Sequence, residues 1–183
     1  MLSFLKNLFT RPANPTGSAE WLVVGLGNPG PEYAATRHNV GYMVVDELSN
    51  DKLQGVALMK PSTYMNSSGE DVAPAAKRLD VAPERIIVCH DELDLPRGAV
   101  KLKLGGNENG HNGLKSLTDH LGTRDYLRVR IGIGRPPAGT TVPDYVLSPV
   151  EGDISEQIRL AAEAVRLIVA EGLARAQHEI HSR

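Results

Sequence analysis

The chain has 183 residues, of which 41% are hydrophobic and 23% are charged, and its formal net charge is −2. This composition is that of a soluble globular protein, and the length predicts one domain with an ordinary core. A single cysteine, Cys89, excludes an internal disulfide framework and suits a reducing cytoplasm. Six scattered histidines and no cysteine pair give no zinc-type spacing.

The first 20 residues, MLSFLKNLFTRPANPTGSAE, are predicted to form a flexible tail in front of a domain at residues 21–183. Lys6 and Asn7 interrupt the apolar residues, so no continuous secretory core forms. The pattern leaves open an amphipathic helix at a membrane surface, but the prolines and glycine that follow favour a mobile tail and linker. No run is long and apolar enough to cross a membrane, and we expect no membrane partner.

Short apolar runs and helical patterns alternate along residues 21–133. In chain order, the runs predict a strand at 21–26, a helix at 40–48, a strand at 56–59, a helix at 68–79 with capping candidates at 66–67, a strand at 85–89, an alternating strand at 99–104, a helix at 113–121 and a strand at 126–133. The segment GRPPAGTTVPD (134–144) is predicted to be a long loop.

The C-terminal segment is predicted to be one long helix. Ser148-Pro149-Val150-Glu151 has the spacing of a capping box with proline at the first helical position, and apolar residues then recur at helical period. Strands that alternate with helices predict an α/β fold. We expect a single domain in three layers, with a twisted, mostly parallel (mixed) sheet flanked by helices.

The stretch from Gly25 to Gly30 spells G-x-G-x-x-G directly after the first predicted strand, and Asp46 follows at a distance typical of a dinucleotide-binding site. The context argues against such a site. Pro29 and Pro31 follow where a helix should open, and Asp46 lies in the first helical segment without a second strand before it. A nucleotide-binding Rossmann domain is therefore a minor alternative.

Polar residues in the loops near the predicted strands indicate the function better than the glycine motif does. They occur in Asn28, Arg37-His38-Asn39, Tyr64-Met65-Asn66, His90-Asp91-Glu92-Leu93-Asp94 and Gly110-His111-Asn112-Gly113, all predicted to be loops. Several amide side chains with a histidine and an aspartate suit ester or amide hydrolysis, because the aspartate can orient an imidazole that activates water. No G-x-S-x-G motif supports a serine nucleophile. Asparagine in loops is otherwise a common cap or turn former, and a buried strand favours simple packing for Cys89 and His90.

Positive charge is concentrated in one part of the chain. Residues 97–135 carry eight Lys/Arg against three Asp/Glu, whereas residues 21–96 and 136–183 are net acidic. Such a block is typical either of a polyanion-binding surface or of an ordinary solvated face.

Taken together, these segments resemble the bacterial peptidyl-tRNA hydrolase family. The resemblance rests on GLGNPGPEYAATRHNVG (25–41), KPSTYMNSSG (60–69), HDELDLPRG (90–98), KLKLGGNENGHNGLKS (101–116) and RVRIGIGRP (128–136), in the family's order. It implies a cytoplasmic enzyme that hydrolyses the ester between peptide and tRNA in peptidyl-tRNA, without a covalent intermediate. Because an ester is labile, one neutral histidine with oriented amides is expected to act without a metal or cofactor. The sequence shows no obvious apolar interface stripe, so we expect a monomer without a stable protein partner.

The resemblance also implies a role for each matching residue. His38 is expected to be the catalytic base, oriented by Asp91, and Asn112 to position the water or polarise the carbonyl. The acceptor end of the tRNA and the peptide main chain are expected to bind at Asn28, Tyr33, Met65, Asn66 and Asn112. Lys103 and Arg130 are expected to contact tRNA phosphates, with Lys101, Lys115, Arg128 and Arg135 as weaker candidates.

The chain departs from the family pattern in two places. The interval between His38 and Asn66 is shorter than in the family, and we expect the end of the first helix and a following strand or hairpin to be absent near residues 49–52. In the loop 105–110, asparagine stands where glycine is expected, and asparagine tolerates left-handed backbone well. The main functional alternative is a non-catalytic RNA-binding relative, although binding alone needs no His–Asp pair.

Overall fold

The computed structural model describes residues 17–183. Of the predicted tail at residues 1–20, residues 1–16 lie outside the described residues. A five-stranded sheet forms the centre of the molecule, with strand order β2-β1-β3-β5-β4. The strands are β1 (Trp21–Gly25), β2 (Val56–Met59), β3 (Ile86–Glu92), β4 (Val100–Leu104) and β5 (Leu127–Gly132). All neighbours are parallel except β4 and β5, which pair antiparallel. The expected mixed, mostly parallel sheet is confirmed.

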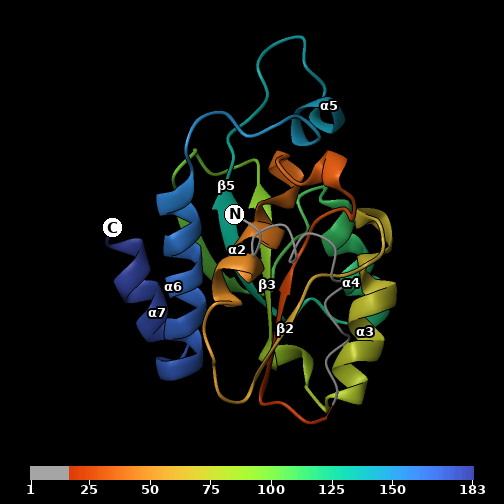
Figure 1. Cartoon of the computed structure of the whole chain (residues 1–183), viewed down its shortest axis with the longest axis vertical. Coiled ribbons are helices and arrows are strands. Elements are labelled where there is room, and N and C mark those ends of the chain that lie inside the picture. Colours follow the sequence, from red (N-terminus) through yellow and green to blue (C-terminus); the bar gives the residue numbers. More distant parts are fainter. Residues whose placement is uncertain (1–16) are drawn as a thin grey trace, which may run out of the picture.

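Helices cover both faces of the sheet and produce the expected three layers (Figure 1). They are α2 (Val40–Leu48), α3 (Ser68–Arg78), α4 (Asn112–Leu121), α5 (Val142–Val146), α6 (Ser155–Glu171) and α7 (Leu173–His181). One face carries α2, α6 and α7, and the other carries α3 and α4. Among the described residues, no helix is long and apolar enough to cross a membrane.

The two cores follow from the alternation of side chains along the strands. Val23, Ile87 and Cys89 point into the core beneath α2 and α6, whereas Leu22 and Val88 point into the core beneath α3 and α4. Cys89 and His90 therefore lie on opposite sides of β3. Every side chain of β3 is buried, which is typical of a central parallel strand.

Helix α2 packs unusually close to the sheet because glycines stand on both sides of the contact. A Cβ atom added to Gly25 would lie 2.2 Å from the carbonyl oxygen of Gly41, and one added to Gly41 would lie 2.3 Å from that of Cys89. The first glycine of the apparent dinucleotide motif thus serves helix–strand packing. Asp46 lies on α2, where it pairs with Lys60 at 2.6 Å.

Three expectations for the second half of the chain are wrong. Helix α6 begins at Ser155 rather than after a capping box at Ser148, because residue 149 instead bridges to Thr36 and the amide of Val150 donates to Ala35. The predicted single C-terminal helix is two helices, separated at Gly172. The predicted loop at 134–144 leads into α5, which is capped by Thr141.

Two further differences concern the loops that carry polar residues. Strand β3 continues through Glu92, so His90 and Asp91 belong to the strand rather than to a loop. Asn112 is the first residue of α4, and Met65 and Asn66 lie in a short 3₁₀ turn (Met65–Ser67). The capping candidates before α3 make no side-chain cap, because this turn leads directly into the helix. Asn109 adopts a left-handed conformation, as expected for an asparagine in that loop.

Candidate active site

A cavity of about 510 Å³ lies at the carboxyl ends of β1 and β3. Open α/β sheets place their ligand sites at this edge, because loops from neighbouring parallel strands meet there. The cavity is lined by 17 residues, among them Asn28, His38, Met65, Asn66, Asp91 and Asn112. A second cavity of about 410 Å³ lies between α2 and α6, but its lining holds neither histidine nor asparagine. We therefore place the chemistry in the first.

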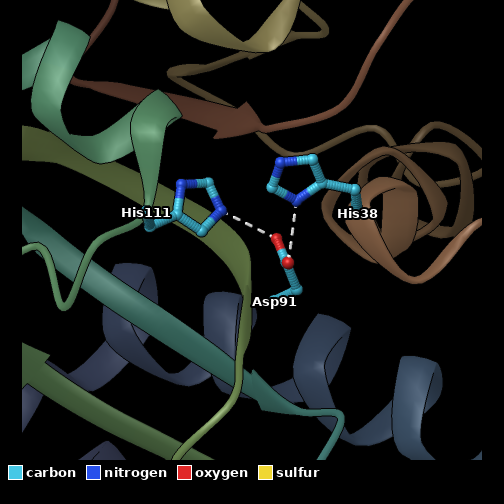
Figure 2. Close-up of side chains that lie close together, drawn as sticks. All are labelled: His38, Asp91 and His111. Atoms are coloured by element: carbon cyan, nitrogen blue, oxygen red, sulfur yellow. Dashed lines mark hydrogen bonds and ion pairs between the residues drawn. The ribbon is translucent and has the colours of Figure 1, made fainter. Parts of the chain in front are cut away.

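Asp91 stands between two imidazoles at the floor of this cavity (Figure 2). Its Oδ2 lies 2.8 Å from Nδ1 of His38, and its Oδ1 lies 2.7 Å from Nε2 of His111. The three side chains come from three separate parts of the chain: the turn before α2, the end of β3 and the residue before α4. Their convergence depends on the sheet topology.

The hydrogen bonds determine which nitrogen of each ring carries the proton. Nδ1 of His111 accepts from the amides of Gly113 and Leu114, at 3.1 and 3.3 Å, and so caps α4. Its Nε2 must then carry the proton and donate to Asp91. His38 likewise donates from Nδ1 to Asp91, which leaves its Nε2 with a free lone pair on the side away from Asp91 (Figure 2).

The electrostatics of this group follow from burial and from the shared carboxylate. Burial acts to raise the pKa of Asp91, but the charges and hydrogen bonds of His111 and His38 outweigh it and hold the pKa well below its usual range. Burial acts to lower the pKa of His38, and the charge and hydrogen bond of Asp91 raise it above the ordinary 6.5. Burial and the neighbouring His111 lower the pKa of His90 to about 3, so His90 is neutral.

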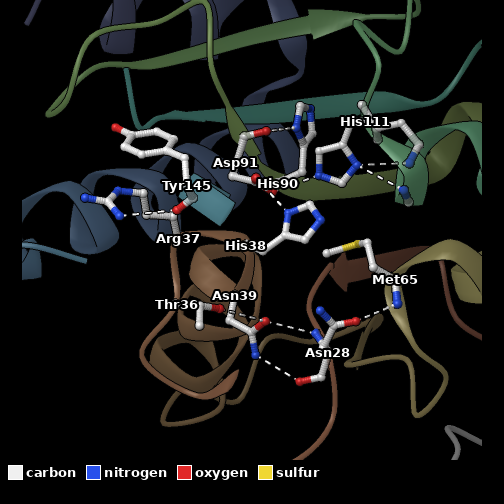
Figure 3. A network of polar contacts seen from close by, with 12 residues as sticks. Asn28, Thr36, Arg37, His38, Asn39, Met65, His90, Asp91, His111 and Tyr145 are labelled. Carbon is white, nitrogen blue, oxygen red and sulfur yellow. Dashed lines mark hydrogen bonds and ion pairs between the residues drawn. The ribbon is translucent and has the colours of Figure 1, made fainter. Parts of the chain in front are cut away.

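Asn28 is held rigidly at the opposite wall (Figure 3). Its backbone amide donates to Oδ1 of Asn39 at 2.9 Å, and its carbonyl accepts from Nδ2 of Asn39 at 3.0 Å. Its own Oδ1 accepts from the amide of Met65 at 2.7 Å. The remaining group, Nδ2, is turned toward His38. Asn39 thus orients Asn28 through its backbone.

The other residues expected to bind substrate lie in or beside the cavity. Met65 is a buried part of the wall, whereas Asn66 and Asn112 are exposed at the cavity. Tyr64 lines the cavity, whereas Tyr33 does not. The ring of Tyr33 packs edge-on against that of Tyr64, with ring centroids 6.2 Å apart. Tyr33 therefore meets the cavity lining through Tyr64, and its expected role in binding substrate stays a prediction.

The basic residues gather on β4 and β5, beside the cavity. Lys101 pairs with Arg130 and Lys103 with Arg128 in the antiparallel register, so all four share one face of the sheet. Burial and the nearby positive charges of Arg130 and Arg128 lower the pKa of Lys103. Arg130 also lies 3.9 Å from Glu92, a residue of the cavity wall.

Two of the weaker candidates for phosphate contact have other partners. Arg128 is fully buried and donates to the carbonyls of Gly106 and Asn107, at 2.7 and 2.6 Å, so it holds the 105–110 loop and cannot reach a phosphate. Arg135 lines the cavity and pairs with Asp94.

Two residues that complete the site were not among the expected site residues. His111 lies in the quoted Gly-His-Asn-Gly segment, but nothing in that segment indicates that its ring reaches Asp91. Asn39 is adjacent to His38, and its two hydrogen bonds to Asn28 span 11 positions of the chain. In the sequence, only its position next to His38, the expected base, indicates that Asn39 belongs to the site.

Comparison with known proteins identifies the family. Residues 22–183 match the family model described as peptidyl-tRNA hydrolase. This chain belongs to the peptidyl-tRNA hydrolase family. It is 57% identical, over 200 aligned positions, to peptidyl-tRNA hydrolase 2 of Corynebacterium glutamicum, covering 100% of this chain and 97% of the relative. It is 46% identical to the peptidyl-tRNA hydrolase of Frankia casuarinae, covering 92% of this chain and 97% of the relative.

Solved structures agree with this assignment. The crystal structure of peptidyl-tRNA hydrolase from Acinetobacter baumannii superposes with a TM-score of 0.81 at 35% identity, covering 93% of this chain and 96% of that one. The family, the fold class and the enzyme class expected from the sequence are confirmed. Nothing in these matches supports the non-catalytic alternative, and the dinucleotide-binding alternative is excluded by the family. The location of the shortened segment near residues 49–52 stays a prediction.

Proposed function

We propose that this chain releases peptide and tRNA from peptidyl-tRNA by using His38 to activate a water molecule. The observation that carries the proposal is the pairing of His38 with Asp91. With Nδ1 bound to the carboxylate at 2.8 Å, the ring is fixed and Nε2 is unprotonated on the cavity side. A neutral imidazole held in one tautomer by a buried carboxylate is suited to general base catalysis.

The reaction balances without any other reagent. Nε2 of His38 takes a proton from water as the water oxygen attacks the ester carbonyl carbon, and Asp91 stabilises the imidazolium that forms. The tetrahedral intermediate then expels the ribose oxygen, which receives the proton from His38. The products are a tRNA with a free hydroxyl and a peptide carboxylic acid, which ionises by releasing one proton to the solvent. An ester is far more labile than a peptide bond, so one base and oriented amides suffice.

Amide groups on two sides of the cavity are proposed to bind the peptide end. Asn28 presents Nδ2 from a backbone that Asn39 holds in place, and Asn112 stands at the first position of α4. Either N–H group can donate to the carbonyl oxygen as it gains negative charge. Asn66, with the wall formed by Met65, is assigned to the peptide main chain, and Tyr33 supports this wall through Tyr64.

The basic face of β4 and β5 is proposed to bind the tRNA acceptor end. Lys103 and Arg130 lie on adjacent strands, and Arg130 is joined to the cavity wall through Glu92. Phosphate contacts of this kind supply affinity without reading the sequence, which suits an enzyme that acts on many tRNAs. Because peptidyl-tRNA arises at ribosomes, we place the enzyme in the cytoplasm.

The test is a comparison of peptide release from peptidyl-tRNA by the wild-type chain and by His38→Ala. We expect the variant to bind tRNA normally and to lose about 10²- to 10⁴-fold in kcat/KM, the usual contribution of general acid–base catalysis. His120→Ala is the matched control, because His120 lies on α4 and bonds only to a helix carbonyl. Binding of tRNA by the wild type without any release of peptide would contradict the proposal.

A further inference from the structure

Glu92 is a buried carboxylate at the cavity for which the proposed reaction has no use. It is the last residue of β3, it is 5% exposed, and it lines the cavity. It follows Asp91 directly but shares no partner with it, because neighbouring strand residues point to opposite sides. Burying a carboxylate is costly unless donors surround it.

The donors around Glu92 are all at long distances. Its Oε1 lies 3.4 Å from Nδ2 of Asn109 and 3.9 Å from Nη1 of Arg130, and its Oε2 lies 3.4 Å from the amide of Asp94. Well-formed hydrogen bonds to a carboxylate are about 2.7–2.9 Å long, and the group has roughly four acceptor positions. Glu92 therefore keeps acceptor capacity for a further donor in the cavity.

The position of Glu92 indicates which part of the substrate supplies that donor. Glu92 lies 3.9 Å from Arg130, the proposed phosphate contact, and it lines the cavity together with Asp91 and the loop from Asn109 to Asn112. In the substrate, the terminal ribose connects the last phosphate to the ester. A residue that is next to both the phosphate contact and the ester contact therefore lies close to that ribose.

The negative charge of a carboxylate further limits which group of the substrate can bind Glu92. Negative charge beside a phosphate site is unfavourable, so Glu92 does not serve phosphate binding itself. The terminal ribose carries one free hydroxyl next to the esterified oxygen, and a hydroxyl is a good donor to a carboxylate. Dinucleotide-binding proteins use an acidic residue in this way for a ribose hydroxyl.

We propose that Glu92 accepts a hydrogen bond from the free hydroxyl of the terminal ribose and thereby favours an RNA end over a deoxy end. A ribose hydroxyl is the group by which proteins distinguish RNA from DNA at a given position. This inference rests on the proposed function, since it takes the phosphate and ester positions from it.

The experiment compares two peptidyl-tRNA substrates, one ending in adenosine and one in 2′-deoxyadenosine, with wild type, Glu92→Leu and Glu92→Gln. For the wild type we expect kcat/KM to be about 10- to 100-fold higher with the ribose end, the usual effect of a hydrogen bond to a charged group. In Glu92→Leu the preference is expected to shrink to the intrinsic difference between the two esters. Glu92→Gln, which keeps an acceptor oxygen but not the charge, is expected to lie between them.

Glu108→Gln is the matched control, because Glu108 is a buried acid next to Asn109 that pairs with Arg124 at 2.9 Å and does not line the cavity. Glu108→Gln is expected to prefer the ribose end over the deoxy end by the same factor in kcat/KM as the wild type. If Glu92→Leu and Glu92→Gln slow both substrates equally, Glu92 only positions its neighbours and the proposal is wrong. An equal rate of the wild type on both substrates also overturns it. Failure of the wild type to release peptide from the ribose end would instead refute the proposed function.

Discussion

Asp91 is the residue on which the site depends, because one buried carboxylate orients two histidines with different tasks. His38 points its free nitrogen at the cavity, whereas His111 uses its second nitrogen to cap α4. Asp91 therefore links His38, the proposed catalytic base, to the helix that begins with Asn112. Removing one member is expected to disturb the others, so single substitutions in this group will not be additive.

The first prediction concerns the pH dependence of the reaction. Asp91 raises the pKa of His38 above 6.5, and His38 must be neutral to act as a base. In the wild type, kcat/KM is thus expected to fall as the pH drops through a value above 6.5. In Asp91→Asn only burial acts on His38, so the acidic limb of the profile should move to lower pH while the plateau falls about 10²- to 10⁴-fold. A pH series of kcat/KM measures both effects, and an unmoved limb would contradict the assigned pairing.

The second prediction separates the two tasks of His111. In His111→Asn the side-chain oxygen can occupy the place of Nδ1 and cap α4, but it cannot reach Asp91. Both His111→Asn and His111→Leu are expected to lose activity and the stability that the bond to Asp91 contributes. His111→Leu is expected to be about 1 kcal/mol less stable than His111→Asn, the value of a helix cap. Thermal unfolding and peptide-release assays on both variants make the comparison; full activity of His111→Asn would show that the contact with Asp91 is dispensable.

At this scale, the sequence indicates residue types well and mutual geometry poorly. The proximity of Asn28, His38 and Asp91 could be predicted because each lies near the end of a predicted strand or the start of a helix, and such positions meet at one edge of a parallel sheet. His111 and Asn39 could not, because their importance lies in hydrogen bonds across 20 and 11 positions of the chain. Tyr33 was expected at the wall, and the structure shows its ring against Tyr64, which lines the cavity.

At the scale of elements, the contact between β1 and α2 sets the position of His38. The turn before α2 carries His38, and α2 lies close to the sheet only because Gly25 and Gly41 have no side chains. This explains why the segment resembles a dinucleotide-binding loop: both structures need glycine where a helix meets a strand. The same glycine spacing therefore serves helix–strand packing in this chain and phosphate binding in dinucleotide-binding proteins.

The third prediction tests this contact with Gly25→Ala. The new methyl group would meet the backbone of Gly41 at 2.2 Å, where no side chain can move aside, so α2 must shift. We expect a loss of at least 3 kcal/mol in unfolding free energy, or a folded protein with little activity because His38 has moved. Gly122→Ala is the control: its site has open space and a φ of 73°, so only about 1–2 kcal/mol of backbone strain is expected. Denaturant unfolding of both variants gives the comparison.

Elements with a strong period were predictable, and those decided by distant contacts were not. The apolar strands β1 and β3 and helix α4 follow from local pattern alone. The apparent capping box at Ser148 fails because residues 149–150 are extended against Ala35 and Thr36, a contact that no local pattern reveals. Helix α5 was missed because its five residues are too few to show a period.

At the scale of the whole molecule, the distribution of charge matters more than its sum. A net charge of −2 suggests no affinity for nucleic acid, yet Lys101, Lys103 and Arg130 lie together on one face of β4 and β5. This face adjoins the cavity through Glu92. An acidic remainder and a basic face together orient an approaching polyanion, because charged clefts steer ligands of opposite sign.

The last prediction follows from this arrangement and concerns Lys103→Ala. Each phosphate contact releases counterions when it forms, so affinity falls with salt in proportion to the number of contacts. Lys103→Ala is expected to weaken tRNA binding and to reduce the slope of log affinity against log salt by about 1. Cleavage of a minimal ester substrate without the tRNA body should be unchanged, because Lys103 is not part of the cavity wall. The control is Lys52→Ala, an exposed lysine before β2 and thus at the opposite end of the sheet from the cavity. Equal salt slopes for wild type and Lys103→Ala would remove Lys103 from the tRNA-binding face, since a residue that contacts a phosphate cannot be lost without changing the number of ions released.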